Sequence, residues 1–453
     1  MRARLANLWD SFRSSFWFVP SIMSLFAIAL AMGTCQLDEM IASSNRELSW
    51  FSTTAEAARS TLSSVAGATI ALAGVVFSIT VLTLSIASSQ FGSRLVRNVM
   101  SDSIADLVIG QYVGTSLYCM LVLQTVREGK NGTDVFTPQL GTAVGLILGL
   151  ICMGMLILFI HHVATAIQAP TIVTAVARDL DLAVDRLFPE RIGERPDEEE
   201  AKLSIEDLRA ELSDNNITVA SQAEGYIEGI DGESLVSLAC EAEGVVELLC
   251  KPGDFVTREK LLARIWLPRD TEKTEDMTTS YTNSVNRVII VGPRRTPRQD
   301  VGYAARELVE IALRALSPGI NDPFTAMSCV DRLGGALGRL VERSVPVRIR
   351  RDDDSVARVL ITEADDFPEV LIQSFGQIRE YGASSTAVSL TILKALTEIT
   401  NHASRPDDIY AIRGEAEALQ TAYVDQHIVK QDLETFRSKY RQLSEILDQD
   451  KQS

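Results

Sequence analysis

Uncharged, apolar residues are concentrated in the first third of the chain, where they form four long blocks. The blocks contain no Asp, Glu, Lys or Arg and cover residues 14–37, 60–93, 107–126 and 135–177. A helix needs about 20 apolar residues to cross a bilayer core, because its backbone groups must be hydrogen-bonded internally where water is absent. The pattern predicts a membrane domain over residues 1–177, with transmembrane helices near 17–37, 61–89, 107–126 and 138–161.

The basic residues before the first block predict the orientation of the chain. Arg2, Arg4 and Arg13 precede this block, a pattern that is also typical of a signal peptide. A retained first helix is the better interpretation, because Thr34 suits a lipoprotein cleavage site poorly and a second block follows closely. The sequence therefore predicts a multi-pass protein of the cytoplasmic (inner) membrane, with its N- and C-termini in the cytoplasm.

Small residues recur at helical spacing along the second and fourth predicted spans. They are Gly67, Ala71, Gly74, Ser78 and Ser85 in the second span, and Gly141, Gly145 and Gly149 in the fourth. Such stripes let two helices approach closely, so packing within one chain is the simpler interpretation. The alternative is a pore wall, in which the serine hydroxyls face water or ions around an axis shared by several subunits.

Beyond residue 177 the long apolar blocks end and charged residues become frequent. Residues 178–216 predict a charged helical connector. Residues 217–300 are divided by glycines and turns into short strands, and the run GVVELLCKPGDFVTREKLLARI resembles half of a biotinyl- or lipoyl-like barrel-sandwich domain. Those carrier domains display a modified lysine at a hairpin tip. No lysine here has that context, so neither group is implied.

Residues 301–453 show helical periodicity and predict a helical cytoplasmic domain. The segment SPGINDPFTA predicts a stiff corner between two helices, with Asp322 as an N-cap and Pro323 in the first turn. Ser317, Asn321 and Asp322 are its polar residues. Capping and turn chemistry is their simpler interpretation, and ligand contact is the alternative. Residues 407–448 predict one long amphipathic helical segment that suits oligomerisation.

The predicted fold class is thus a membrane α-helical bundle of four transmembrane helices followed by a soluble mixed α+β domain. That domain contains a small barrel-sandwich-like β module and a C-terminal helical region.

The charge balance limits the expected partners. The net charge is −17, which disfavours nucleic acid because its phosphates are bound mainly by Lys and Arg. Arg294, Arg295 and Arg298 form a local basic cluster and a candidate contact for a lipid or another anion. Pairing with neighbouring carboxylates is the simpler interpretation. The expected partners are membrane lipids, further copies of the chain and an unidentified cytosolic ligand.

Residue types also limit the expected chemistry. The six cysteines are scattered, without a CxxC pair or a nearby histidine at zinc spacing. They are typical of buried thiols in a reducing compartment. The chain has four histidines and no GxSxG, HExxH, P-loop or dinucleotide-binding pattern. The sequence predicts a protein that is not an enzyme and that holds no metal or cofactor.

Four segments together resemble one known family. They are FSITVLTLSIASSQFGSRL (77–95), FIHH (159–162), GYIEGID (225–231) and IALRALSPGINDPFTA (311–326). In this order they resemble the bacterial family of predicted membrane proteins catalogued as domain of unknown function 2254. The resemblance covers nearly the whole chain and implies four spans followed by a cytoplasmic domain. It implies no activity, substrate or catalytic residue.

Two functions are compatible with these patterns. The first is an oligomeric channel-like protein that passes ions or small solutes under control of the cytoplasmic domain. The predicted spans contain no Asp, Glu, Lys or Arg, which argues against an ion-coupled transporter but not against a passive pore. The alternative is a membrane-anchored sensor or scaffold whose cytoplasmic domain binds a ligand or a partner.

Overall fold

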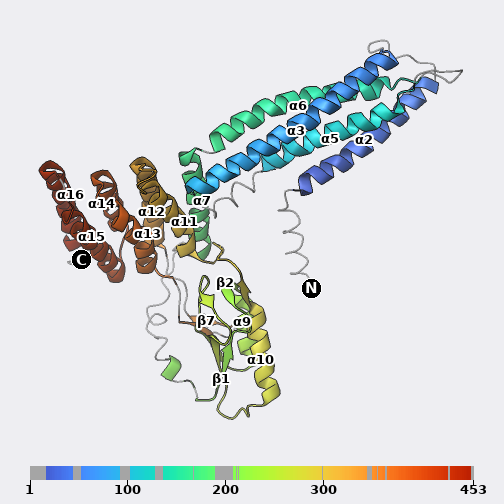
Figure 1. Ribbon diagram of the computed structural model, residues 1–453. Helices are drawn as coiled ribbons and strands as arrows, with labels where there is room; N and C mark the ends of the chain where they lie inside the picture. The colour runs from blue at the N-terminus through green and yellow to red at the C-terminus, as the bar shows by residue number, and fades with distance from the viewer. Residues whose placement is uncertain are drawn as a thin grey trace. The chain divides into compact units, whose positions relative to one another are not determined.

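The computed structural model describes residues 17–43, 53–91, 103–127, 136–166, 168–188, 208–210, 212, 214–297, 299–343, 349–352, 354, 356–362, 365–426 and 429–449. The chain divides into two compact units, residues 1–171 and 172–453. Figure 1 labels the elements of both units.

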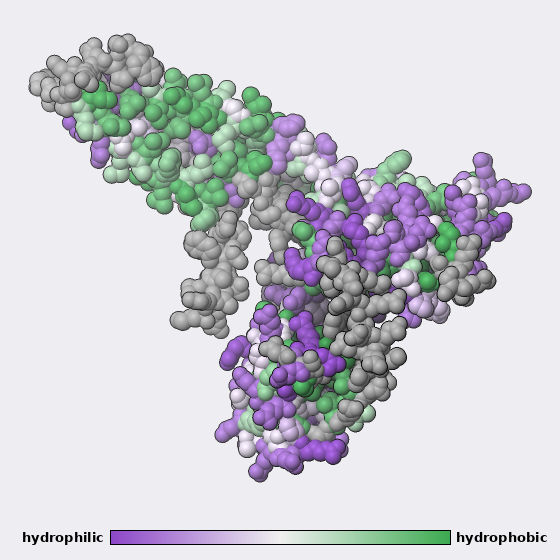
Figure 2. Space-filling model, turned by 180° about the vertical axis from the view of Figure 1, so that it is seen from behind, coloured by the Kyte–Doolittle hydropathy of each residue, from purple (hydrophilic) through white to green (hydrophobic). Residues whose placement is uncertain are grey.

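Four helices of the first unit are long and apolar enough to cross a membrane. They are α2 (Phe18–Ser43), α3 (Ala55–Phe91), α5 (Ser103–Thr125) and α6 (Gln139–Ala166). Many of their large apolar side chains point outward, including Leu25 (67% exposed), Phe77 (48%) and Leu158 (67%). Figure 2 shows the resulting hydrophobic surface in green. The prediction of four apolar N-terminal helices is confirmed, and their outer surface suits lipid rather than water.

Helix α5 is the most buried of the four. In its 18-residue apolar stretch 56% of the residues are buried, against 17–22% in the other three helices. Its two buried tyrosines tie it to α6. The Tyr112 hydroxyl donates to the carbonyl of Cys152 at 2.9 Å, and the Tyr118 hydroxyl donates to the carbonyl of Gly141 at 3.0 Å. A buried phenol needs such a partner, so these bonds fix α5 against α6.

The first apolar helix extends beyond its predicted end at residue 37 and carries Asp38 within the candidate span Phe18–Ile41. The Asp38 carboxylate is 4% exposed and accepts the backbone N–H groups of Leu140 at 2.9 Å and Gly141 at 2.8 Å. The first N–H groups of a helix lack partners within the helix, and Asp38 supplies them for α6. Helix α2 thus carries an acidic residue just beyond the charge-free block 14–37, as α3 and α5 do with Glu56 and Asp106 just before theirs.

The second unit begins with helix α7 (Ala169–Leu187), whose first three residues belong to the first unit. This helix is amphipathic and buries Val173, Val176 and Leu180. Asp181 pairs with Arg339 on α12 (Pro323–Glu342), and Asp185 pairs at 2.5 Å with Arg343, the C-cap residue of that helix. Residues 178–187, predicted to be a connector, therefore form part of a packed helix.

The strands of the second unit form two open sheets. One contains, in order, β1 (Asn216–Ala220), β5 (Leu261–Trp266), β3 (Val245–Leu248), β8 (Ala357–Ile361) and β7 (Ile349–Arg351); the other contains β4 (Phe255–Val256), β2 (Gly225–Ile230) and β6 (Ile289–Gly292). Pairing is antiparallel except between β3 and β8. Helices α9 (Gly232–Glu241) and α10 (Glu275–Val288) contribute Leu235 and Val285 to the apolar core around these strands.

No barrel is closed among the described strands, so the barrel-sandwich prediction is not confirmed. The predicted half-barrel sequence is divided between the sheets, because β3 and β5 lie in one and β4 lies in the other. In addition, β8 pairs with β3 from more than one hundred residues away, Val359 opposite Val246. Strands β7 and β8 lie within the region that was predicted to be helical. Short strands in a charged run such as RIRRDDDSVARVLI give little periodic signal.

The remaining helices are α11 (Val301–Ala315), α12, α13 (Phe367–Gly382), α14 (Thr386–Thr400), α15 (Pro406–Val424) and α16 (Lys430–Gln449). They lie side by side in Figure 1. The predicted single C-terminal segment is two helices, α15 and α16, which contact each other through the stacked rings of Tyr423 and Phe436 at 4.1 Å. Its apolar face is therefore buried within the unit rather than left open for oligomerisation.

Candidate functional site

The small residues of α3 lie on the outside of the first unit. Gly67, Ala71, Gly74, Ser78 and Ser85 are all exposed. A Cβ atom built on Gly67 or Gly74 would meet no atom within 4 Å, and the Ser78 hydroxyl donates to the carbonyl of Gly74 at 2.9 Å. The face is slightly hollowed where Ala71, Gly74 and Ser78 line it. In one copy of the chain this surface is open to another helix.

Gly141, Gly145 and Gly149 of α6 have the opposite placement, because they face other helices of the same chain. A Cβ atom on Gly145 would lie 2.9 Å from the Leu62 side chain, and one on Gly149 would lie 3.1 Å from that of Val65. A Cβ atom on Gly141 would approach the Val122 side chain to 2.8 Å. These three glycines serve contacts within the chain, with α3 and α5.

The polar corner between α11 and α12 is engaged in turn and cap contacts. Asp322 accepts the backbone N–H of Thr325 at 3.1 Å and the Thr325 hydroxyl at 2.5 Å, so its predicted N-cap role is confirmed, with Pro323 in the first turn. Ser317 donates to the carbonyl of Arg314 at 2.6 Å. Asn321 has φ of +50°, which a short polar residue tolerates. These contacts account for the polar residues of the corner without a ligand.

The predicted arginine cluster is not a single open surface. Arg295 donates to the buried carboxylate of Asp300 through Nε at 2.9 Å and Nη2 at 2.5 Å, and its guanidinium lies over the Tyr303 ring. Asp300 in turn caps α11 by accepting the Tyr303 N–H at 2.7 Å. Arg294 is exposed, and Arg298 lies outside the described residues. Arg295 therefore has a structural partner and is not available to an anion.

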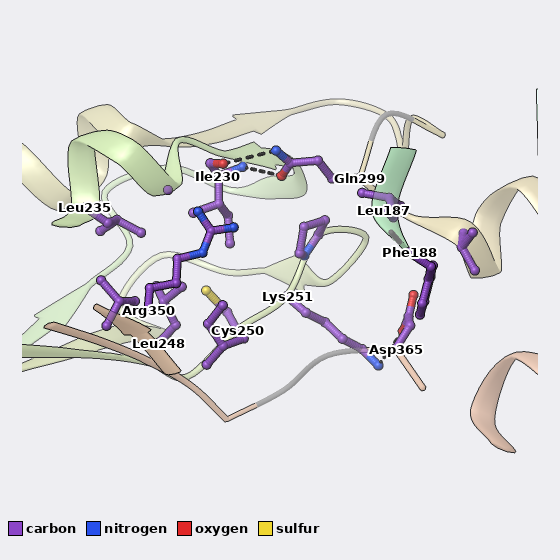
Figure 3. A pocket seen from close by; sticks show the side chains of 15 residues that line it. Leu187, Phe188, Ile230, Leu235, Leu248, Cys250, Lys251, Gln299, Arg350 and Asp365 are labelled. Atoms are coloured by element: carbon purple, nitrogen blue, oxygen red, sulfur yellow. Dashed lines mark hydrogen bonds and ion pairs between the residues drawn. The ribbon is translucent and has the colours of Figure 1, made fainter. Parts of the chain in front are cut away.

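The second unit contains a partly enclosed pocket of about 210 Å³, shown in Figure 3. Its lining is mainly apolar, and includes Leu187, Phe188, Ile230, Leu235, Leu248 and Val359. These side chains come from the end of α7, the end of β2, the first turns of α9, and the parallel strands β3 and β8. The Cys250 thiol is also at the wall, where it donates to the carbonyl of Leu262 at 3.4 Å.

A single amide maintains one wall of this pocket. Gln299 accepts the Ile230 N–H at 2.8 Å and donates to the Ile230 carbonyl at 3.1 Å, the two dashed lines in Figure 3. It thus takes the place of a strand partner beside the end of β2. The amide oxygen and one amide N–H of Gln299 are therefore engaged in holding the end of β2 beside the pocket.

Lys251 forms an ion cluster at the edge of the pocket. Its Nζ lies 2.9 Å from Asp365 Oδ1 and 2.8 Å from Glu369 Oε1. Burial alone would lower the pKa of Lys251, but its hydrogen bonds with Glu369 and Asp365 raise the pKa above its ordinary value. The ammonium stays charged at neutral pH, and its charge is already matched by two carboxylates.

Arg350 is the other cation of the pocket. In Figure 3 its side chain crosses the pocket from β7, and its guanidinium points toward Ile230, away from the Lys251 cluster. The guanidinium is so close to Gly232 that a Cβ atom there would collide with it. Within the described part of the chain, the Arg350 side chain makes neither a hydrogen bond nor an ion pair. The pocket therefore combines an apolar cavity with one exposed guanidinium that has no carboxylate partner among the described residues.

Sequence reasoning did not single out Arg350 or Lys251. Lys251 lies in the KPGD turn, whose partners at residues 365 and 369 are more than one hundred residues away. Arg350 lies in a short charged run that gives little periodic signal for a strand. Nor do three or more His, Cys, Asp or Glu side chains gather anywhere in the described ranges as a metal ion would require.

Comparison with known proteins places the chain among uncharacterised relatives. A family model described as "Predicted membrane protein (DUF2254)" matches residues 13–398. The uncharacterised proteins Rv1290c of Mycobacterium tuberculosis and Mb1321c of Mycobacterium bovis are each 30% identical to the chain over 417 residues, which is 91% of this chain and 77% of theirs. No solved structure matches the chain.

Proposed function

Because the chain belongs to the DUF2254 family of predicted membrane proteins, we propose that it works in the membrane as an oligomeric, channel-like protein for ions or small solutes. The observation that carries the proposal is the exposed small-residue face of α3, defined by Gly67, Ala71, Gly74, Ser78 and Ser85. Gly141, Gly145 and Gly149 of α6 are used inside one chain, whereas no described residue of the same chain packs against Gly67 or Gly74.

Small residues favour close helix contact in a membrane, where packing rather than water exclusion drives association. A face of this kind that meets only lipid gains nothing from its small residues. Several copies around one axis would bring their α3 helices together, and a ring of more than two subunits encloses a central path. The serine side chains would then supply hydroxyls to that path.

The experiment is a flux assay on purified protein in liposomes. Ser78→Leu adds bulk to the proposed pore wall and should change the flux several-fold. Ala68→Leu is the matched control, because Ala68 is also exposed on α3 but lies about 100° around the helix from Gly67. Absence of flux in the wild type under voltage, tension and pH steps would count against the channel. Equal effects of the two variants would count against the α3 face as its wall.

We further propose that the protein resides in the cytoplasmic membrane with both termini in the cytoplasm. Support comes from the arginines before α2 and from the even number of candidate spans. Protease added to intact cells should leave the second unit uncut, and protease added after permeabilisation should cut it. Cleavage from outside intact cells would overturn this orientation.

A second candidate function is a membrane-anchored sensor, and the pocket of the second unit is the observation that favours it. Ligand sites are typically concave and mostly apolar, with a few placed polar groups. If the second unit responds to a ligand, the spans serve to hold it at the membrane. A broad metabolite screen by thermal shift of the full-length protein tests this function, because a ligand that binds only the folded state stabilises it.

A further inference from the structure

We propose that the pocket between α7, β2, α9, β3, β8 and Arg350 binds a small organic monocarboxylate, with its apolar body in the cavity and its carboxylate on the Arg350 guanidinium. This binding site does not depend on the proposed channel function. It rests on the proposed sensor function only in that binding of the ligand would be the signal.

The size and lining of the pocket specify the body of the ligand. A cavity of about 210 Å³ is somewhat larger than the ~150 Å³ apolar cavity that holds a benzene molecule in an engineered protein. Leu235, Leu248 and Val359 are at most 3% exposed and offer no hydrogen-bonding group. A single ring or a short aliphatic chain therefore fits, whereas a nucleotide or a sugar does not.

Arg350 specifies the anionic group. A guanidinium presents parallel N–H donors that match the two oxygens of a carboxylate. Its position across the pocket, against Gly232, brings these donors to the cavity (Figure 3). Since no carboxylate among the described residues already pairs with it, the guanidinium keeps its bonding capacity for a ligand.

The surrounding charges favour a single negative charge on the ligand. Lys251 is already matched by Asp365 and Glu369. Asp231, next to Gly232, remains ionised, because hydrogen bonds from Ser234 lower its pKa. A second negative charge would therefore meet carboxylates and no free cation among the described residues. This arrangement selects a carboxylate over a dianionic phosphate.

Direct binding to the full-length protein in detergent tests the proposal, with calorimetry as the readout. The probes are benzoate, cyclohexanecarboxylate and hexanoate, with benzamide as the neutral counterpart of benzoate and benzylphosphonate, measured above its second pKa, as a dianion. We expect at least one monocarboxylate to bind and the neutral and dianionic probes to bind far more weakly. The proposal is overturned if no monocarboxylate binds, or if benzamide or benzylphosphonate binds as well as benzoate.

Two variants locate the site. Arg350→Gln should weaken monocarboxylate binding about tenfold or more, since a hydrogen-bonded ion pair is lost. Gly232→Ala keeps every charge but displaces the guanidinium, and should weaken binding several-fold. Arg351→Gln is the matched control, because Arg351 is also exposed on β7 but does not line the pocket, and it should bind as the wild type does.

Unfolding curves of the three variants establish that each is folded before binding is compared. Arg350→Gln or Gly232→Ala binding as tightly as the wild type would overturn the assigned role of Arg350. Oligomer size and flux, measured on the same samples, report on the channel separately, so failure of one proposal is distinguishable from failure of the other.

Discussion

The carboxylate of Asp38 on α2 accepts the backbone N–H of Gly141 at 2.8 Å, in the first turn of α6. A negative charge at this end of a helix also interacts favourably with the helix dipole. The same Gly141 carbonyl accepts the Tyr118 hydroxyl from α5. One residue of α6 thus joins three of the four apolar helices, and Asp38 fixes where α6 begins.

Replacement of Asp38 by alanine should destabilise the first unit. Removal of the carboxylate leaves buried N–H groups without a partner, which costs about 1–3 kcal/mol. Thermal unfolding of the protein in detergent measures the loss. Glu39→Ala is the control, because Glu39 is exposed on the same helix. If both variants unfold at the same temperature, the cap does not stabilise the bundle.

The two glycine faces should respond differently to added bulk. The Leu side chain of Gly145→Leu would collide with the Leu62 and Cys119 side chains. This variant should destabilise the protein by about 1–3 kcal/mol. Gly74→Leu meets no atom within 4 Å in the same chain and should leave the stability of a single copy unchanged. Thermal unfolding in a detergent that dissociates oligomers compares the two. A larger loss for Gly74→Leu would contradict the assigned placement.

Lys251→Met should destabilise the second unit by about 1–2 kcal/mol, since it leaves Asp365 and Glu369 facing each other without a cation. The pKa of Lys251 is raised in the folded state. The stabilisation is therefore fully present below the ordinary pKa of 10.5 and is lost as the pH rises through the higher, folded-state pKa.

Denaturant unfolding of wild type and Lys251→Met at several pH values measures this contribution. The difference between the two proteins should be constant around neutral pH and should shrink only at strongly alkaline pH. A difference that already declines between neutral pH and the ordinary lysine pKa would show that the cluster does not hold the charge of Lys251.

Asp322→Ala tests whether the corner between α11 and α12 is structural. Loss of the N-cap of α12 should destabilise the second unit by about 0.5–2 kcal/mol. Flux and ligand binding of the folded variant should equal those of the wild type, because Asp322 lies neither on the α3 face nor at the pocket. Loss of flux or of ligand binding in a stably folded variant would show that the corner has a functional role as well.

The sequence predicted best what depends on local pattern. The four apolar helices follow from uninterrupted apolar blocks, and the Asp322 cap follows from the Asn-Asp-Pro order. It predicted less well what depends on partners far along the chain. The stripes of Gly67 and Gly145 have the same spacing, and only tertiary packing makes one of them internal. Strand β8 was missed because its partner β3 lies more than one hundred residues earlier.

The same reason explains why the pocket was not anticipated. Arg350 and Asp365 lie within charged runs and Lys251 lies in a turn, and folding brings all three to the wall of one cavity. The first span was predicted to end before Asp38, because a charged residue is a normal boundary signal for a membrane helix. Helix α2 nevertheless continues through Asp38, whose carboxylate accepts backbone N–H groups of Leu140 and Gly141 at the start of α6.

Native mass spectrometry of the full-length protein, extracted in mild detergent, tests the central claim most directly. A channel lined by the α3 face requires a closed ring, so the account predicts a single species of three or more subunits. Gly74→Leu should shift that species toward smaller assemblies. A wild-type protein that is monomeric or a simple dimer would contradict the channel, and would leave the pocket of the second unit as the place to seek the function.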